Sequence, residues 1–320
     1  MAITGSGTQE SPWLVHSYEE LRTVTTDRTY LPNYGKAWAA LDADINCNDY
    51  GADFEWETIN LGVSGSYSSP YGAMSFDLNG HTIKNIPVKL NNSLFNANFT
   101  ASNAGDAEFK GNGKLLNVFT QPSSTAYLII GRNASHVISN LSMSVSLGNN
   151  SKGVFRDTAL NGVACYIEGG SFTVSSDVNA LILSFSQTGD TATDYRIKDS
   201  DFEVYVNNLQ TALYSAYNQA QRLVAIDSRF RGKLTSTSEV NLEFISCGYI
   251  SNCVVDVDFL NFTATNAKIS RYTCNGVIDG DKIPSSGFSI SGLTSCTSSE
   301  IINGEALRSK NFTVVNVVGD

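Results

Sequence analysis

The sequence predicts an all-β protein, a single-stranded right-handed parallel β-helix (a solenoid) with a short N-terminal capping helix. Three observations predict it: a motif that recurs seven times, a turn position restricted to Asn, Asp and Gly, and alternating polar and apolar residues after the turn. Intervals of 23 to 30 residues between turns fit coils of short strands that stack in parallel. Such irregular spacing favours a β-helix, which absorbs insertions in its outer loops, over leucine-rich or propeller repeats.

The turn position is the most restricted part of the motif. Asn, Asp and Gly tolerate a left-handed backbone, so a position shared by only these three predicts a positive φ and a sharp bend. The turn residues are Asn140, Gly169, Asp199, Asp227, Asn252, Asn275 and Asn303. One bend per coil follows from this pattern.

Apolar residues on either side of the turn predict two inward stacks. Beyond the turn the chain alternates: Phe202 and Val204 point one way while Glu203 points the other, as in a half-buried strand. The stack before the turn consists of Ile138, Ile167, Ile197 and Ile250, and the stack after it consists of Phe172, Phe202 and Phe230.

The first residues differ from the repeat. Ser17 to Glu20 form a capping box ahead of Leu21 and Val24, which predicts a short amphipathic helix that shields the open end of the solenoid. Phe76 to Ile83 and Phe109 to Leu116 share an Asn-Gly pattern 33 residues apart, so the repeat reaches back to about residue 38. We therefore expect an N-terminal cap over residues 1–37 and a parallel β-helix over residues 38–320.

Several N-terminal motifs together resemble the opening of the pectin-lyase-like right-handed β-helices of phage and bacterial surface proteins. These motifs are Gly7-Thr8, Ser11-Pro12-Trp13-Leu14-Val15, Glu19-Glu20-Leu21, Leu41-Asp42-Ala43-Asp44-Ile45 and Phe76-Asp77-Leu78-Asn79-Gly80-His81-Thr82-Ile83. The resemblance covers roughly residues 5 to 90 and implies the fold, while leaving the activity open. The sequence departs from that family at Leu78, where Gly is frequent, but Asn79-Gly80 still supplies a bend.

Composition excludes several functions. Charged residues are 16% of the chain and the net charge is −10, so a nucleic-acid partner is not expected. No apolar run approaches the roughly 20 residues that cross a bilayer, so we expect no membrane insertion. The six cysteines form no CxxC pair, which predicts neither a zinc site nor a disulfide framework. We expect no metal and no cofactor.

The strongest candidate site is an outward row of charged residues on neighbouring coils. By offset from the turn, Asp201 lies beside Arg229, Glu203 lies beside Arg231, and Asp256 follows on the next coil. The resemblance implies that related enzymes use clustered Asp or Glu on this outer face, so Asp201, Glu203 and Asp256 are the alternative catalytic residues. Alternating acids and bases also describe a solvated ion-pair ladder, which we favour.

Three tyrosines are candidate ligand-binding residues. Tyr205, Tyr214 and Tyr217 would form a sugar-stacking platform if exposed, and lateral packing is the alternative role for each. Leu209 to Tyr217 also has helical spacing, although Tyr214 to Tyr217 is compatible with a strand of the coil.

The sequence favours a structural and host-binding component of a phage virion, of the tail spike, fibre or appendage type, over an enzyme. The start Met1-Ala2-Ile3-Thr4 lacks the features of a signal peptide, so we expect synthesis in the host cytoplasm and assembly into the virion. Expected partners are other virion proteins and a host surface glycan. The resemblance implies a homotrimer, as in a spike or fibre, and a monomer that assembles on a larger scaffold is the alternative. The alternatives are a glycan depolymerase, either a lyase or a hydrolase, and a bacterial surface adhesin domain.

Overall fold

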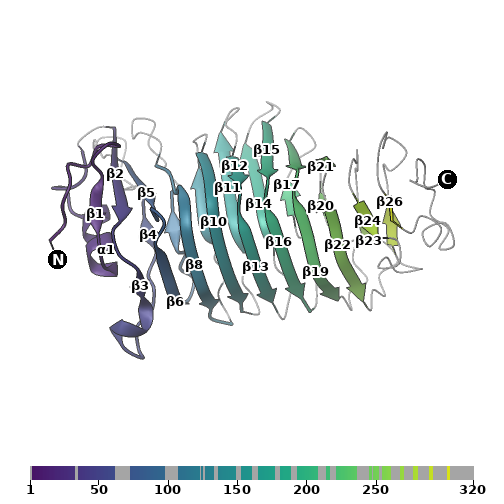
Figure 1. The fold of residues 1–320 in the computed structure, drawn as a ribbon, viewed down its shortest axis with the longest axis horizontal. Helices are drawn as coiled ribbons and strands as arrows, with labels where there is room; N and C mark the ends of the chain where they lie inside the picture. Colours follow the sequence, from purple (N-terminus) through teal and green to yellow (C-terminus); the bar gives the residue numbers. More distant parts are fainter. Residues whose placement is uncertain are drawn as a thin grey trace.

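The chain folds into a rod of parallel β-strands coiled about a common axis, with β1 near one end and β26 near the other (Figure 1). This computed structural model describes residues 2–32, 35–61, 73–97, 107–122, 124, 127–132, 136–148, 153–160, 165–176, 181–188, 193–207, 214–216, 221–235, 245–246, 248–251, 254–260, 267–269, 277–279, 288–290 and 301–302. Every pair of named strands is parallel, which confirms the predicted all-β solenoid.

A three-stranded sheet begins the rod. Its strands are β1 (Trp13–Val15), β2 (Lys36–Leu41) and β5 (Ala73–Asp77). Trp13 lies opposite Ala39, and Ala39 lies opposite Phe76 one coil later. Parallel pairing therefore begins at Trp13, within the segment assigned to the cap from sequence; the domain boundary at residue 37 stays a prediction.

A fourteen-stranded sheet forms two faces of the rod that meet at β10 (His136–Leu147). Residues of β10 before Asn140 pair with β12, and residues after it pair with β13, so the bend at Asn140 directs the chain from one face to the next. The other strands are β3 (Ile45–Asn46), β6 (Thr82–Val88), β8 (Gly111–Thr120), β12 (Cys165–Glu168), β13 (Ser171–Ser176), β15 (Thr193–Lys198), β16 (Asp201–Val206), β18 (Gln221–Ile226), β19 (Arg229–Thr235), β21 (Gly248–Ser251), β22 (Val254–Leu260), β24 (Val277–Asp279) and β26 (Ile301–Ile302).

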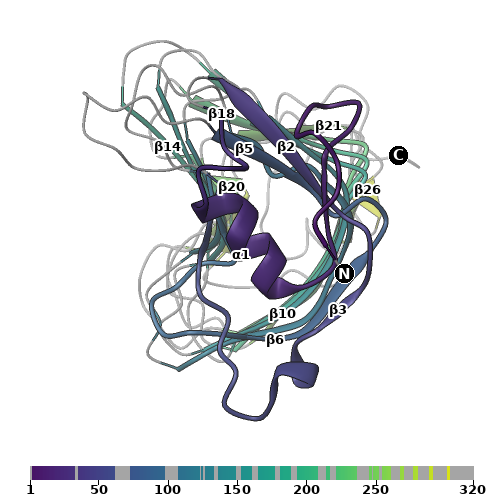
Figure 2. The same cartoon turned by 90° about the vertical axis from the view of Figure 1, so that its left-hand side faces the viewer.

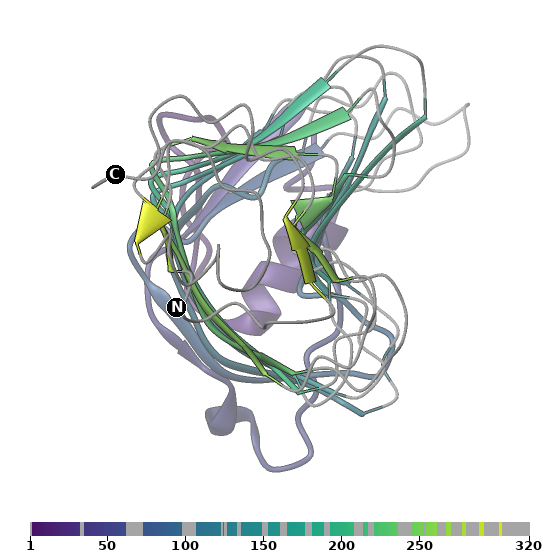
Figure 3. The same cartoon turned by 90° about the vertical axis from the view of Figure 1, so that its right-hand side faces the viewer.

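A seven-stranded sheet closes the coil on the remaining side, and the strands of successive coils superpose when the rod is seen from its end (Figure 3). Its strands are β4 (Ile59–Asn60), β7 (Phe95–Asn96), β9 (Tyr127–Arg132), β11 (Gly153–Leu160), β14 (Leu181–Thr188), β17 (Tyr214–Ala216) and β20 (Ile245–Ser246). A separate pair consists of β23 (Ala267–Ile269) and β25 (Phe288–Ile290). The strand alternative for Tyr214 to Ala216 is thereby confirmed.

The turn positions have the predicted backbone. Asn140, Gly169, Asp199 and Asp227 have φ of 49°, 65°, 49° and 50°. The same column extends toward the N-terminus through two residues with φ of 51° and 50°, Asn79 and Asn112. The remaining predicted turn residues, Asn252, Asn275 and Asn303, lie outside the described part of the chain.

Both predicted inward stacks are present in register. Ile138 lies opposite Ile167, and Ile167 lies opposite Ile197, each with its side chain buried. Ile250 continues this column at the backbone, opposite Ala225. Burial of each large side chain contributes on the order of 1.5 to 3 kcal/mol, so the columns supply a large share of the core energy.

The phenylalanine stack consists of parallel rings on three successive coils. The ring centroids of Phe172 and Phe202 lie 4.7 Å apart with planes inclined by 20°, and those of Phe202 and Phe230 lie 5.5 Å apart with planes inclined by 13°. These separations match the spacing of parallel strands. The register of the backbone therefore places like side chains on one another.

A second left-handed position, which the sequence analysis missed, occurs in the early coils. Asn85 and Asn117 have φ of 56° and 52°. The side-chain amide of Asn85 donates to Oδ1 of Asn46 at 2.9 Å, and that of Asn117 donates to Oδ1 of Asn85 at 2.7 Å. This asparagine ladder joins three coils and ends where the backbone N–H of Asn117 donates to Oγ of Ser144 at 2.7 Å.

Buried serines satisfy the backbone next to the main turn. Oγ of Ser200 accepts from the N–H of Gly170, and Oγ of Ser228 accepts from the N–H of Ser200, both at 3.2 Å. Each hydroxyl donates to the carbonyl two residues earlier, at Lys198 and Ile226, at 2.8 Å. A sharp bend buries polar backbone groups, and these hydroxyls pair them.

The predicted capping helix is α1 (Tyr18–Thr26), which lies across the open end of the solenoid (Figure 2). Oγ of Ser17 accepts from the N–H of Glu20 at 3.2 Å, as expected for the first residue of a capping box. Leu21 and Val24 are fully buried. The apolar face of the helix thus covers the core that the first coil would otherwise expose. One short 3-10 helix, η1 (Cys47–Tyr50), follows β3.

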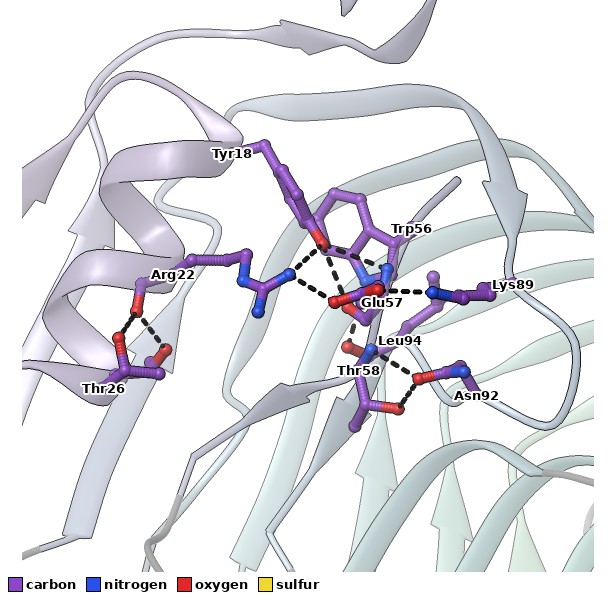
Figure 4. Close-up of polar contacts among 10 residues, drawn as sticks. Tyr18, Arg22, Thr26, Trp56, Glu57, Thr58, Lys89, Asn92 and Leu94 are labelled. Carbon is purple, nitrogen blue, oxygen red and sulfur yellow. Dashed lines mark hydrogen bonds and ion pairs between the residues drawn. The ribbon is translucent and has the colours of Figure 1, made fainter. Parts of the chain in front are cut away.

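A polar network fastens α1 to the first two coils (Figure 4). The carboxylate of Glu57 pairs with Arg22 at 2.6 Å and with Lys89 at 2.5 Å. Tyr18 accepts from the N–H of Glu57 at 3.0 Å. Hydrogen bonds from Lys89 and Arg22 hold the pKa of the Glu57 carboxyl below its usual range.

The positive φ at Asp199 predicts how substitutions there affect stability. We expect Asp199→Val to lower the free energy of unfolding more than Asp199→Gly, by roughly 1 to 2 kcal/mol, because a β-branched residue is strained in this backbone region. Urea unfolding of both variants measures the difference, and Asp199→Asn is the matched control. Equal stability of the Val and Gly variants would contradict the turn assignment.

The Glu57 network predicts a pH dependence. The native pKa of Glu57 is lowered, so its stabilising contribution is fully present above the ordinary Glu pKa and disappears as the pH falls through the native value. Glu57→Gln should therefore be less stable than the wild type at pH 7 and equal to it under acidic conditions. Thermal unfolding at both pH values tests this, and an undiminished difference in acid would count against the network.

Candidate functional site

The strands β8, β10, β13, β16 and β19 lie side by side along the rod (Figure 1). The charged row predicted from sequence lies on the outward side of these strands, which we call the outer face. Backbone pairing is in register from β10 through β13 and β16 to β19, so the outward residues of these four strands form rows that run along the rod. The strand β8 pairs with β10 across one β-bulge. From β10 to β19, the three rows are Ser142, Ser171, Asp201 and Arg229; Ser144, Thr173, Glu203 and Arg231; and Ser146, Ser175, Tyr205 and Lys233.

The predicted register of the charged row is confirmed, but the ion pairs within it run diagonally. Asp201 lies opposite Arg229, and Glu203 lies opposite Arg231. The guanidinium of Arg231 binds both oxygens of Asp201 at 3.2 Å and also contacts Oε2 of Glu203 at 3.1 Å. One arginine therefore holds both carboxylates, and the hydrogen bond with Asp201 raises the pKa of Arg231.

Tyr205 is joined to this ladder. Its hydroxyl donates to Oε1 of Glu203 at 2.5 Å, and this hydrogen bond raises the pKa of Tyr205. Tyr205 is 43% exposed, which confirms that its ring reaches the surface. One oxygen of Glu203 binds Arg231 and the other accepts the Tyr205 hydroxyl, so the ion pair holds the Tyr205 side chain in place.

The other candidate site residues are distributed differently. Asp256 lies opposite Arg231 on β22, but its side chain lies outside the described residues. Tyr214 belongs to β17 in the seven-stranded sheet, whereas Tyr205 belongs to the fourteen-stranded sheet. Tyr217 lies outside the described part of the chain. The described residues thus bring together Asp201, Glu203 and Tyr205.

A cluster of hydroxyl groups adjoins the ladder. The residues Ser142, Ser144 and Ser146 of β10 lie beside Ser171, Thr173 and Ser175 of β13, and we call these six residues the hydroxyl floor. Those of β13 are all exposed. Hydroxyls recur every two residues along a strand, roughly 7 Å, and every strand, roughly 4.8 Å. The floor is a grid of hydroxyl groups, and each hydroxyl can both donate and accept hydrogen bonds.

Two large exposed rings border the hydroxyl floor. Phe119 lies opposite Ser146 from β8, and Tyr205 lies opposite Ser175 from β16. Both rings are 43% exposed. The left-handed residue Asn117 inserts an extra residue into β8, and this bulge aligns Phe119 with the row of Tyr205.

An open groove of about 550 Å³ continues the floor at the corner of the coil. Its lining residues are Asp77, Asn79, Gly80, Asn112, Gly113, Lys114, Asn140 and Ser142. Asp77 accepts from the side-chain amide of Asn112 at 2.9 Å, which orients that amide. Ser142 belongs to both features, so the floor and the polar groove adjoin at this residue.

A second charged cluster lies away from this face. Glu108 pairs with Lys36 at 2.5 Å and also with Lys110, and both ammonium groups lie over the ring of Trp38. The pKa of the Glu108 carboxyl is below its usual value. Burial alone would raise this pKa, but the hydrogen bonds from Lys110 and Lys36 have the larger combined effect. We interpret this cluster as a set of ion pairs that stabilises the stacking of neighbouring coils.

The potential metal ligands and the cysteine Cys47 are further candidate groups. No group of three or more His, Cys, Asp or Glu side chains there lies in position to hold a metal ion. Cys47 is buried, and burial raises the pKa of its thiol to about 12, so it stays protonated at neutral pH. No helix in this part of the chain is long and apolar enough to span a bilayer.

Comparison with known proteins assigns the chain to no family. No protein-family model matches the chain, and no curated protein matches its sequence. The chain is similar to a crystal structure from Bacteroides ovatus described as a candidate immunoglobulin A1 protease, with 17% sequence identity and a TM-score of 0.40. That similarity covers 85% of this chain and 80% of the other, and it carries no argument about fold or activity.

The outer face contains residues that the sequence analysis missed. A signal for the floor exists, because Ser-x-Ser-x-Ser at 142–146 and Ser-x-Thr-x-Ser at 171–175 recur 29 residues apart. Phe119 had no comparable signal, since its outward direction depends on the bulge at Asn117.

The bond between Tyr205 and Glu203 predicts a titration shift. We expect the phenol of Tyr205 to ionise at a higher pH than an ordinary tyrosine, and Glu203→Gln to lower its pKa by removing the charged acceptor. Carbon NMR of protein labelled at the tyrosine ζ-carbon measures this, with the Tyr205 signal assigned by Tyr205→Phe. A Tyr205 pKa that is unchanged in Glu203→Gln would show that the bond is not formed.

Proposed function

We propose that this β-helix is a non-cutting, glycan-binding component of a phage virion surface, as a tail spike, fibre or appendage. The observation that carries the non-cutting part is the position of Arg231 between Asp201 and Glu203. A general acid must deliver a proton to the glycosidic oxygen, while its partner carboxylate attacks or activates water. Here one guanidinium, that of Arg231, binds both carboxylates, so neither carboxylate is free to act as the proton donor while the other attacks.

Glycan binding is supported by the chemistry of the same face. Exposed rings and an array of hydroxyl groups suit a ligand with apolar ring faces and many hydroxyl groups. The net charge of −10 opposes binding to nucleic acid. The ladder, the rings and the floor together therefore favour recognition of a host surface glycan.

The virion assignment rests on the resemblance of the N-terminal motifs to phage and bacterial surface β-helices. Parts of those motifs lie in β1, α1, β2, β3, β5 and β6, and the departing residue Leu78 is buried in the core. Other virion proteins are the proposed partners. A homotrimer stays a prediction, which a mass measurement in solution tests.

A depolymerase is the alternative, and the row Asp201, Glu203 and Asp256 is where it would act. In that case the variant Arg231→Met, which removes the guanidinium, would release Asp201 and Glu203 from their ion pairs and should not abolish cleavage of the glycan. A bacterial adhesin would use the same binding surface, and it differs in location: antibody labelling of phage particles and of bacterial cells separates these two assignments.

The decisive experiment incubates the purified full chain with bacterial capsular and lipopolysaccharide glycans. We expect retention on at least one glycan without release of reducing ends or of unsaturated products. Release of such products that Glu203→Gln or Asp201→Asn abolishes, with folding retained by circular dichroism, would replace the binding role with that of a depolymerase. If the chain binds none of the glycans, the recognition role is overturned and a structural role remains.

A further inference from the structure

We propose that the glycan lies along the rod axis over the hydroxyl floor, with one sugar stacked on Phe119 and another on Tyr205. This inference rests on the proposed glycan-binding function. The two rings lie in one row, separated by Ser146 and Ser175. Three strand spacings place them roughly 14 Å apart. The ligand is a polysaccharide segment long enough to reach both rings at once.

The placement of the two rings carries the inference. Among the described residues, the exposed large apolar side chains are Leu90, Phe119 and Tyr205. Two of these three occupy the same row on the same face, at both borders of the floor. Single exposed apolar side chains are common and need no explanation. The inference therefore rests on the shared row of the two rings and on the hydroxyl groups between them.

The space between the rings suits a sugar chain. Ser146 and Ser175 are exposed and short, so they leave the path from ring to ring open. Thr173 and Ser171 add further exposed hydroxyls beside that path. Sugar hydroxyls pair with such groups in either direction, because a serine or threonine hydroxyl donates one hydrogen bond and accepts others.

A protein partner fits this surface less well. Stable protein interfaces have an apolar centre and a polar rim, whereas here the centre is polar and the apolar groups stand at two borders. The polar groove lined by Asn112, Lys114 and Asn140 continues the same chemistry beyond the floor. A glycan satisfies both the polar centre and the separated rings.

The ion-pair ladder acquires a role in this arrangement. Arg231 holds Glu203, and Glu203 accepts the hydroxyl of Tyr205, so the ring is fixed before a ligand arrives. Fixing a binding side chain in advance reduces the entropy lost on association. Arg231 and Glu203 are thus positioning residues for the Tyr205 ring.

The test measures affinity for a panel of immobilised, purified bacterial capsular polysaccharides and O-polysaccharides. Phe119→Ala and Tyr205→Ala should each lower the affinity for the glycan that the wild type retains by about tenfold. Leu90→Ala is the matched control, because Leu90 is also exposed but stands outside the row, and we expect no change. Tyr205→Phe keeps the ring and should retain most of the affinity.

A conservative variant tests the floor separately. Thr173→Val keeps the β-branched shape and removes only the hydroxyl, so folding is preserved and affinity should fall by a few fold. Retention of the glycan at wild-type affinity by both ring variants would overturn this placement, while the proposed recognition role would stand. Loss of binding in Leu90→Ala equal to that in the ring variants would also overturn it. A wild-type chain that binds no glycan would overturn both.

Discussion

The in-register parallel pairing of one coil on the next is the constraint on which the rest of the structure depends. It places each side chain over its counterpart at the spacing of parallel strands, as the rings of Phe172 and Phe202 show at 4.7 Å. A shift of one residue would move the whole inward set to the surface. The repeated left-handed turn at Asn140, Gly169 and Asp199 prevents that shift, because it restarts each strand at the same point.

The ends of such a rod need protection, since an open coil exposes both core and strand edges. At the N-terminal end α1 buries Leu21 and Val24 against the first coil. Glu57 then joins the helix to the second coil through Arg22 and Lys89. These pairs are partly exposed, so their role is to orient the helix, while apolar burial supplies most of the attachment energy.

The same register that builds the core also builds the outer face. Small hydroxyl residues lie outward on β10 and β13, and the larger residues Phe119 on β8 and Tyr205 on β16 lie at their borders. Outward residues can therefore vary to suit a ligand, because the inward residues that alternate with them maintain the fold. This separation of inward and outward positions explains how Asp201, Glu203 and Arg231 form a ladder without disturbing the Phe202 stack.

The sequence by itself determined the solenoid, the turn column from Asn140 to Asp227, the two inward stacks and the capping helix, because each depends on local backbone preference or on strict periodicity. It also determined that Glu203 and Arg231 are neighbours, since register follows from the turn. The tertiary structure alone decided that Arg231 reaches diagonally to Asp201, and that the bulge at Asn117 aligns Phe119 with Tyr205. Side-chain direction across coils depends on insertions and rotamers in three dimensions, and a linear pattern does not record them.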